Sequence, residues 1–144
     1  MSNILRFFPV FVLLCVLCVA GCGKKVWPEP DDSQEKFTVS IKDYQIISDD
    51  CLNIYVEIQG AQKNIAGMTL ELEASDDPCP TCPFQANTTT FIEPGSSMLR
   101  HEQGQMIIRN CGIDPDKHYR ARLKAKNIYS IIRDVTSNVI LIEK

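Results

Sequence analysis

The clearest β-strand signal of the chain lies in residues 111–127, which read CGIDPDKHYRARLKAKN. From Tyr119 to Lys126, apolar or small side chains alternate with basic ones, so one face of the segment is apolar and the other is cationic. Alternation with a period of two is typical of a strand with one buried and one solvated face. Gly112 and Pro115, which lie among aspartates, predict a turn that leads into this strand.

The same alternation recurs on both sides of this segment, from Phe37 onward. The expected strands are residues 37–41 and 44–47, 52–58, 68–72, 106–108, 119–125 and 139–141, with an irregularity at Lys42-Asp43. Short alternating strands separated by Gly, Pro and Asp turns indicate an antiparallel sandwich of about seven strands, each sheet with one solvated face. We therefore expect an all-β domain over residues 37–144.

The first 22 residues resemble the signal of a bacterial lipoprotein. Arg6 precedes an apolar run, residues 7–19, which is short for a membrane span and typical of a secretory signal peptide. The run closes on Val19-Ala20-Gly21-Cys22, which is similar to the lipobox of that family. The resemblance implies cleavage between Gly21 and Cys22 and lipidation of the Cys22 thiol and its new amino terminus. An ordinary signal peptide, or an N-terminal membrane helix with an incidental cysteine, is the alternative.

This resemblance implies three parts: a signal peptide (1–21), a lipidated N-terminus with a flexible spacer (22–36), and the sandwich (37–144). Residues 23–36 contain two prolines, many charges and few apolar side chains, a composition typical of an unfolded linker. Gly23 follows the lipidated cysteine. In enteric bacteria an aspartate there retains a lipoprotein at the inner membrane, so the resemblance implies the outer membrane, on its periplasmic or surface face.

Residues 111–127 are also similar to the sixth-strand region of fibronectin type III domains. The positions of that family's pattern are filled by Ile113, Pro115, Tyr119, Ala121, Leu123, Ala125 and Asn127. The resemblance implies an immunoglobulin-like sandwich with a tyrosine corner, in which the Tyr119 ring is buried and its hydroxyl bonds to upstream backbone. Val56 stands where the family's second strand usually carries tryptophan. We expect Met68 or Phe91 to fill that volume.

Four cysteines belong to the expected mature domain: Cys51, Cys79, Cys82 and Cys111. An even number in an oxidising compartment favours disulfides. In the resembling fold all four lie toward one end, where Cys51–Cys111 would join neighbouring strands and Cys79–Cys82 would pin the loop after the third strand. The other two pairings remain open, as do a four-thiolate zinc site and a redox Cys-x-x-Cys pair, although redox pairs usually lie at a helix N-terminus.

The sequence contains no recognisable nucleophile elbow, phosphate loop or catalytic carboxylate pair. The net charge of −3 and the lack of a basic, aromatic-rich patch argue against a nucleic-acid partner. We expect no enzyme, cofactor or metal, but a lipid-anchored envelope protein that binds the membrane through its lipid and a protein through its sandwich, in interaction, adhesion or scaffolding. The alternative is a redox or metal-handling lipoprotein that uses Cys79 and Cys82.

The loop between the last two strands offers a surface for a partner. Tyr129, Ile131 and Arg133 combine aromatic, aliphatic and guanidinium side chains, the types that contribute most to protein interfaces. The opposing expectation is that the last strand begins early, so that Ile131 or Ile132 enters the core or an edge ladder.

Overall fold

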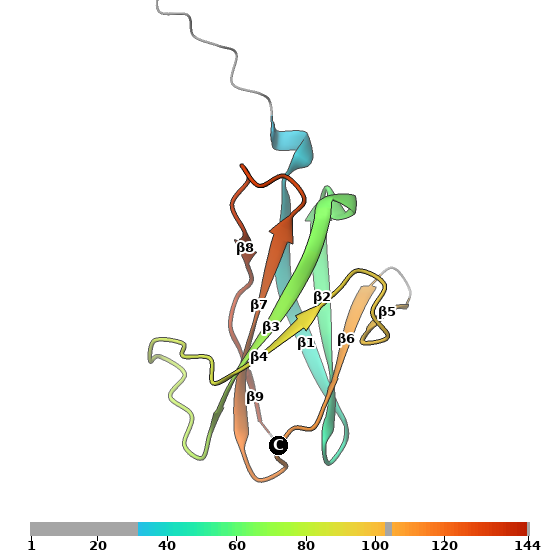
Figure 1. Ribbon diagram of the computed structural model, residues 1–144. Coiled ribbons are helices and arrows are strands. Elements are labelled where there is room, and N and C mark those ends of the chain that lie inside the picture. Colours follow the sequence, from blue (N-terminus) through green and yellow to red (C-terminus); the bar gives the residue numbers. More distant parts are fainter. Residues whose placement is uncertain (1–31, 103–104, 144) are drawn as a thin grey trace, which may run out of the picture. The chain divides into compact units, whose positions relative to one another are not determined.

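Two antiparallel sheets pack face to face in the computed structural model, which describes residues 32–102 and 105–143 (Figure 1). The strands are β1 (Phe37–Ser48), β2 (Cys51–Gly60), β3 (Ile65–Ser75), β4 (Thr88–Ile92), β5 (Leu99–Glu102), β6 (Gln105–Cys111), β7 (His118–Asn127), β8 (Val135–Thr136) and β9 (Ile140–Ile142). Two 3-10 turns, η1 (Asp32–Glu35) and η2 (Gln62–Asn64), precede β1 and β3. The expected all-β, immunoglobulin-like sandwich is confirmed. Among the described residues no helix is long and apolar enough to cross a membrane.

The strand order is that of immunoglobulin-like domains. One sheet runs β1-β2-β6-β5, the order A-B-E-D of those domains, and the other runs β4-β3-β7-β8, with β9 also paired to β7. The second sheet thus carries the strands C, F and G together with one extra edge strand, β4, beside C. The described residues form nine strands rather than about seven. The expected segments 37–41 and 44–47 are joined in β1, β4 and β5 were not expected, and the last strand is divided into β8 and β9.

The core lies where the alternation places it. Its largest fully buried side chains are Leu52, Ile54, Val56, Leu70, Ile92, Ile108 and Leu123. The expected irregularity in the first strand is confirmed by a register shift between Ile41 and Asp43 in the β1–β2 ladder. Beyond this shift β1 is mostly exposed, and Ile41 is its last buried residue, although Tyr44 still packs against the core.

Met68 and Phe91 lie on opposite faces of their sheet. Met68 pairs with Ile92 and both face the core, whereas Phe91 pairs with Thr69 and is 60% exposed. The expectation that Phe91 helps to replace the missing tryptophan is therefore wrong, and Met68, 2% exposed, is the side chain that is buried. The Phe91 ring lies over Gly67 so closely that a Cβ atom at Gly67 would be 2.7 Å from it. A larger residue at position 67 would therefore require the exposed Phe91 ring to shift.

The turn before β7 forms the expected tyrosine corner. Tyr119 is 7% exposed, and its hydroxyl accepts a hydrogen bond of 2.7 Å from the backbone N–H of Asp114. Pro115 follows directly, and Ile113 is buried beneath the turn. The hydroxyl thus fixes the path of the chain between the two sheets.

We expect Tyr119→Phe to lower the free energy of unfolding by about 1 kcal/mol, because it removes one hydrogen bond and keeps the ring. Urea denaturation of the two proteins measures the difference. Tyr44→Phe is the matched control, since the Tyr44 hydroxyl bonds to exposed backbone at Glu143. Equal midpoints for Tyr119→Phe and the wild type would contradict a stabilising corner.

The last residues of the expected spacer belong to the folded unit. The Asn127 side-chain amide donates to the backbone carbonyl of Glu35 at 2.9 Å, and the N–H of Ala61 donates to the carbonyl of Lys36 at 3.0 Å. These bonds hold residues 35–36 against Ala61 in the β2–β3 connection and Asn127 at the end of β7. Residues 22–31 of the expected spacer, which include Cys22, and the signal peptide with Gly21 lie outside the described residues.

Candidate interaction surfaces at the two ends of the sandwich

Both disulfides of the described domain form within the expected pairs. Cys51 and Cys111 face each other in the β2–β6 ladder and are joined by an S–S bond of 2.04 Å. Cys79 is bonded to Cys82 in the loop between β3 and β4. All four sulfurs are therefore engaged with one another, and nowhere in residues 32–102 and 105–143 do three or more His, Cys, Asp or Glu side chains form a group that could hold a metal ion.

Residues 76–87 form a long loop that is fastened to the sandwich at its base. The Asn87 side chain pairs with both backbone groups of Ala74, accepting from its N–H at 3.0 Å and donating to its carbonyl at 2.9 Å. The backbone N–H of Gln85 donates to the Glu73 carboxylate at 2.8 Å. Together with the Cys79–Cys82 bond, these contacts fix both arms of the loop. We call residues 76–87 the pinned loop.

Arg120 is the centre of this arrangement. One of its terminal nitrogens donates to the carbonyls of Cys79 and Cys82, each at 2.8 Å. The other donates to the carbonyl of Pro83 at 3.1 Å and to the Glu73 carboxylate at 2.6 Å. The guanidinium thus gathers the carbonyls of the disulfide-closed turn around one cation, and the residue is only 3% exposed.

The burial of Arg120 corrects the expectation that this face of β7 is solvated. The pinned loop folds over the start of β7 and covers the position, while Arg122 and Lys124 further along remain partly exposed. Phe84 extends the cover, with its ring centroid 4.4 Å from the Arg122 guanidinium carbon and 5.6 Å from that of Arg120. Glu73 and Arg120 are direct partners in the β3–β7 ladder. Their opposite charges could have predicted the ion pair, but only once the pairing of these two strands is known.

Two glutamates of β3 balance these cations. Burial raises the pKa of the Glu71 carboxyl, but hydrogen bonds from Lys124 and Arg122 outweigh it and hold the pKa below its ordinary value of 4.5. Burial likewise raises the pKa of the Glu73 carboxyl, but hydrogen bonds from the Gln85 N–H and from Arg120 outweigh it, so that the net pKa is also below 4.5. Because both folded pKa values lie below the unfolded ones, this stabilisation is present above about pH 4.5 and is lost as the pH falls through the folded values.

The opposite end of β7 carries the loop expected to meet a partner. Ile131 is 83% exposed, Ile128 and Tyr129 are about half exposed, and Arg133 is exposed. The expectation that the last strand begins early is therefore wrong, since β8 begins only at Val135. The chain turns instead, because the Asn127 side chain accepts from the Tyr129 N–H at 2.9 Å and the Ile132 N–H donates to the Tyr129 carbonyl at 3.0 Å. We call residues 128–133 the apolar loop.

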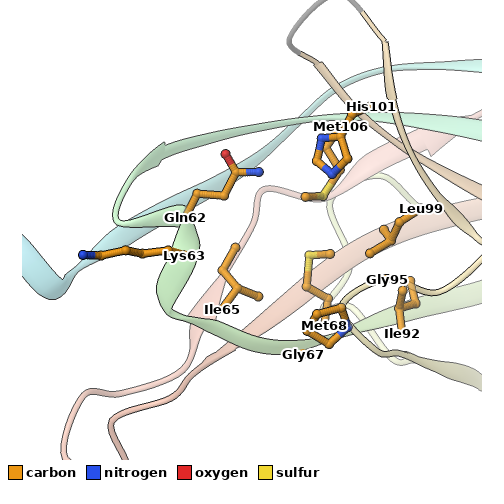
Figure 2. Close-up of a pocket in the computed structure, with 11 residues that line it drawn as sticks. Gln62, Lys63, Ile65, Gly67, Met68, Ile92, Gly95, Leu99, His101 and Met106 are labelled. Carbon is orange, nitrogen blue, oxygen red and sulfur yellow. The ribbon is translucent and has the colours of Figure 1, made fainter.

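A small cavity opens at the edge between the two sheets (Figure 2). Met68, Ile92, Leu99 and Met106 form its apolar wall, and Gln62, Lys63 and His101 lie around it. Its volume of about 230 Å³ is below the range of roughly 300–1,000 Å³ that small-molecule sites usually occupy. We interpret it as the open edge of the core between β4 and β5 rather than as a ligand site.

Comparison with known proteins leaves the function to be argued from these surfaces, because no protein-family model and no curated protein sequence matches the chain. The structure brings the predicted residues together in two groups. Tyr129, Ile131 and Arg133 follow the end of β7, and Cys79 and Cys82 lie near its beginning, where Arg120 binds their carbonyls. Arg120 and Phe84 are the residues that sequence reasoning missed.

Proposed function

We propose that this chain is a lipid-anchored, non-catalytic envelope lipoprotein whose fibronectin type III-like sandwich binds a protein partner in interaction, adhesion or scaffolding. The lipobox-like residues 19–22 support the anchor. The cysteine pattern supports export, because disulfides persist in oxidising compartments and four cysteines of the sandwich are paired. Cys22 then remains for lipidation, at the outer membrane as Gly23 implies.

We expect Cys22→Ser to abolish labelling by palmitate and to leave an uncleaved precursor or a soluble product. Each buried methylene contributes about 0.8 kcal/mol, so two or three acyl chains anchor a protein nearly irreversibly, and their loss should be complete rather than graded. Metabolic labelling and detergent partitioning measure both effects, with Cys18→Ser as the matched control within the signal. A Cys22→Ser protein that still carries label would contradict the lipobox assignment.

The observation that supports partner binding is the way Arg120 holds the pinned loop. A loop whose carbonyls are fixed by one buried cation and whose turn is closed by a disulfide has little conformational freedom left to lose on binding, and preorganisation of this kind favours affinity. Its outer residues, Pro80 to Pro83, are exposed and uncharged. The loop projects sideways from the half of the sandwich that lies away from residues 35–36 (Figure 1).

We expect Thr81→Arg to abolish capture of the protein partner from crosslinked membranes while leaving the melting temperature unchanged, because Thr81 is exposed at the tip of the pinned loop. Quantitative mass spectrometry of the captured proteins measures the effect. Thr136→Arg, the same substitution at an exposed position of β8, is the matched control and should keep the wild-type partner. Equal capture by both variants would place the binding surface elsewhere.

The alternative function, a redox or metal-handling role for Cys79 and Cys82, has the exposure of Cys82 in its favour, because an external thiol can reach the bond. Against it, the motif lies between two strands, and no helix follows to lower a thiol pKa. Thiol titration of the native protein separates the two functions. The structural role predicts no free thiol before a reductant is added. It also predicts that a Cys79→Ala, Cys82→Ala variant that retains its fold captures the partner more weakly but still captures it, because that variant loses only part of the preorganisation of the loop.

A further inference from the structure

We propose that the apolar loop, residues 128–133, inserts into the headgroup region of the bilayer that carries the lipid anchor. This inference rests on the proposed lipidation of Cys22, and it assigns to the loop a lipid surface rather than a protein. The pinned loop at the other end of β7 then remains the surface for the protein partner.

The position of the apolar loop follows from its contacts with the beginning of the folded unit. Asn127, the residue before the loop, bonds to the carbonyl of Glu35 at 2.9 Å. The loop and the first residues of β1 together line a groove of about 580 Å³, formed by residues 36–38 on one side and 131–135 on the other. The apolar loop therefore lies beside the point where the chain enters the sandwich (Figure 1).

The length of chain before this point limits how far the loop can be from the membrane. Asp32, the first described residue, follows Cys22 by ten residues. A fully extended chain of that length spans at most about 36 Å, and any bend shortens it. Asp32 is thus held within that distance of the lipid, whatever conformation the connecting residues adopt, and the apolar loop lies at the same end of the domain.

The side chains of the loop suit the membrane interface. Isoleucine at the tip supplies apolar surface, with Ile131 83% and Ile128 51% exposed, and Tyr129 beside them has the amphipathic ring that is enriched at headgroup level. Their charged neighbours are mixed, since the exposed Lys126 and Arg133 are accompanied by the exposed Asp134. Insertion should therefore be driven by apolar area and depend little on anionic lipid.

A protein partner is less favoured at this loop than lipid. The tether brings the loop toward the bilayer, so a protein would have to enter between the domain and the membrane. The exposed apolar side chains of the loop are also few, namely Ile128, Tyr129 and Ile131, which suits shallow insertion into lipid. A protein at this place remains an outcome of the test rather than the expected occupant.

The test uses the mature, lipidated protein reconstituted into phosphatidylcholine vesicles with and without brominated acyl chains, which quench nearby tryptophan. Trp27→Phe removes the single native tryptophan, and Ile131→Trp then adds a reporter at the tip of the apolar loop. The matched control, Trp27→Phe with Thr81→Trp, carries its reporter on the exposed pinned loop. We expect brominated lipid to quench the reporter at position 131 at least severalfold more than the one at position 81, with little change when anionic lipid is added.

Two further measurements keep the outcomes distinct. Flotation with the vesicles and the intact mass report lipidation, so a protein that is not lipidated and does not float contradicts the proposed function itself. A protein that floats but shows equal quenching at both positions overturns only the insertion of the loop. A reporter at position 131 that brominated lipid does not quench, but that native membranes shield from acrylamide, would assign the loop to a protein partner and also overturn the inference. Ile128→Ser in the reporter background should reduce the quenching, and a small fall in its melting temperature is expected because Ile128 is only half exposed.

Discussion

Simultaneous replacement of Cys51 and Cys111 by alanine is expected to lower the free energy of unfolding by about 4 kcal/mol. The bond joins residues that are 60 positions apart, so without it the unfolded chain gains the entropy of a long open loop. The cysteines already face each other in the β2–β6 ladder, and alanine fits a strand, so we expect the native structure to persist. Denaturation by guanidinium chloride, in the absence of reductant, measures the loss.

The second disulfide provides the matched control for this prediction. Cys79 and Cys82 are only three positions apart, and the chain-entropy model gives such a short loop about 2 kcal/mol. Replacing that pair by alanine should therefore cost roughly half as much. Equal losses from the two double variants would contradict an account based on loop length and would point to local contacts of the sulfurs.

Replacement of Arg120 by methionine is expected to lower the free energy of unfolding by about 3 kcal/mol. Removal of one partner from a buried ion pair usually costs about 3–5 kcal/mol, and we take the lower end because the Glu73 side chain is 21% exposed. The carbonyls of Cys79, Cys82 and Pro83 would also lose their donor. Methionine keeps the apolar stem, so the charge and its hydrogen bonds account for the change.

Arg122→Met is the control for Arg120→Met. Arg122 lies on the same face of β7 and also pairs with a glutamate, but its side chain is 26% exposed and donates to none of the loop carbonyls. We expect it to cost about 1 kcal/mol. Hydrogen exchange of residues 76–87 adds a local measurement, since only Arg120→Met should release the pinned loop. Similar exchange in both variants would show that the disulfide alone fixes the loop.

Strands could be predicted from the sequence where every second side chain faces the core and is therefore apolar. In β2, Leu52, Ile54 and Val56 alternate with polar residues and are fully buried, because each sheet has one face against the other. β4 and β5 lie at sheet edges and carry mostly exposed side chains. Their sequences therefore lack the alternation of apolar and polar residues that predicted the other strands. Their positions are set by pairing with β3 and β6, which is a property of the assembled sheets.

The sequence predicted the two candidate surfaces only in part, because contacts that form in the folded chain decide their structure. The pinned loop was expected from its cysteines, but Arg120 could not be distinguished from the other cations of β7, because its burial depends on a loop that lies more than thirty residues earlier in the chain. In the apolar loop, the run Ile128-Tyr129-Ser130-Ile131-Ile132 suits a strand as well as a turn. A hydrogen bond that the Asn127 side-chain oxygen accepts from the Tyr129 N–H, and the turn at Ile132, decide between them.

The Cys51–Cys111 bond has a mechanical consequence for a domain attached at one end and loaded at the other. A pulling force applied through the N-terminus enters at β1, whose long antiparallel ladder with β2 would be loaded in shear. If the sandwich ruptures, the bond closes residues 51–111 into a covalent ring that cannot be drawn out. About 200 Å of contour length is thereby withheld from extension. A stretched molecule would keep β2 and β6 joined at one point, from which the sheet can re-form when the tension falls.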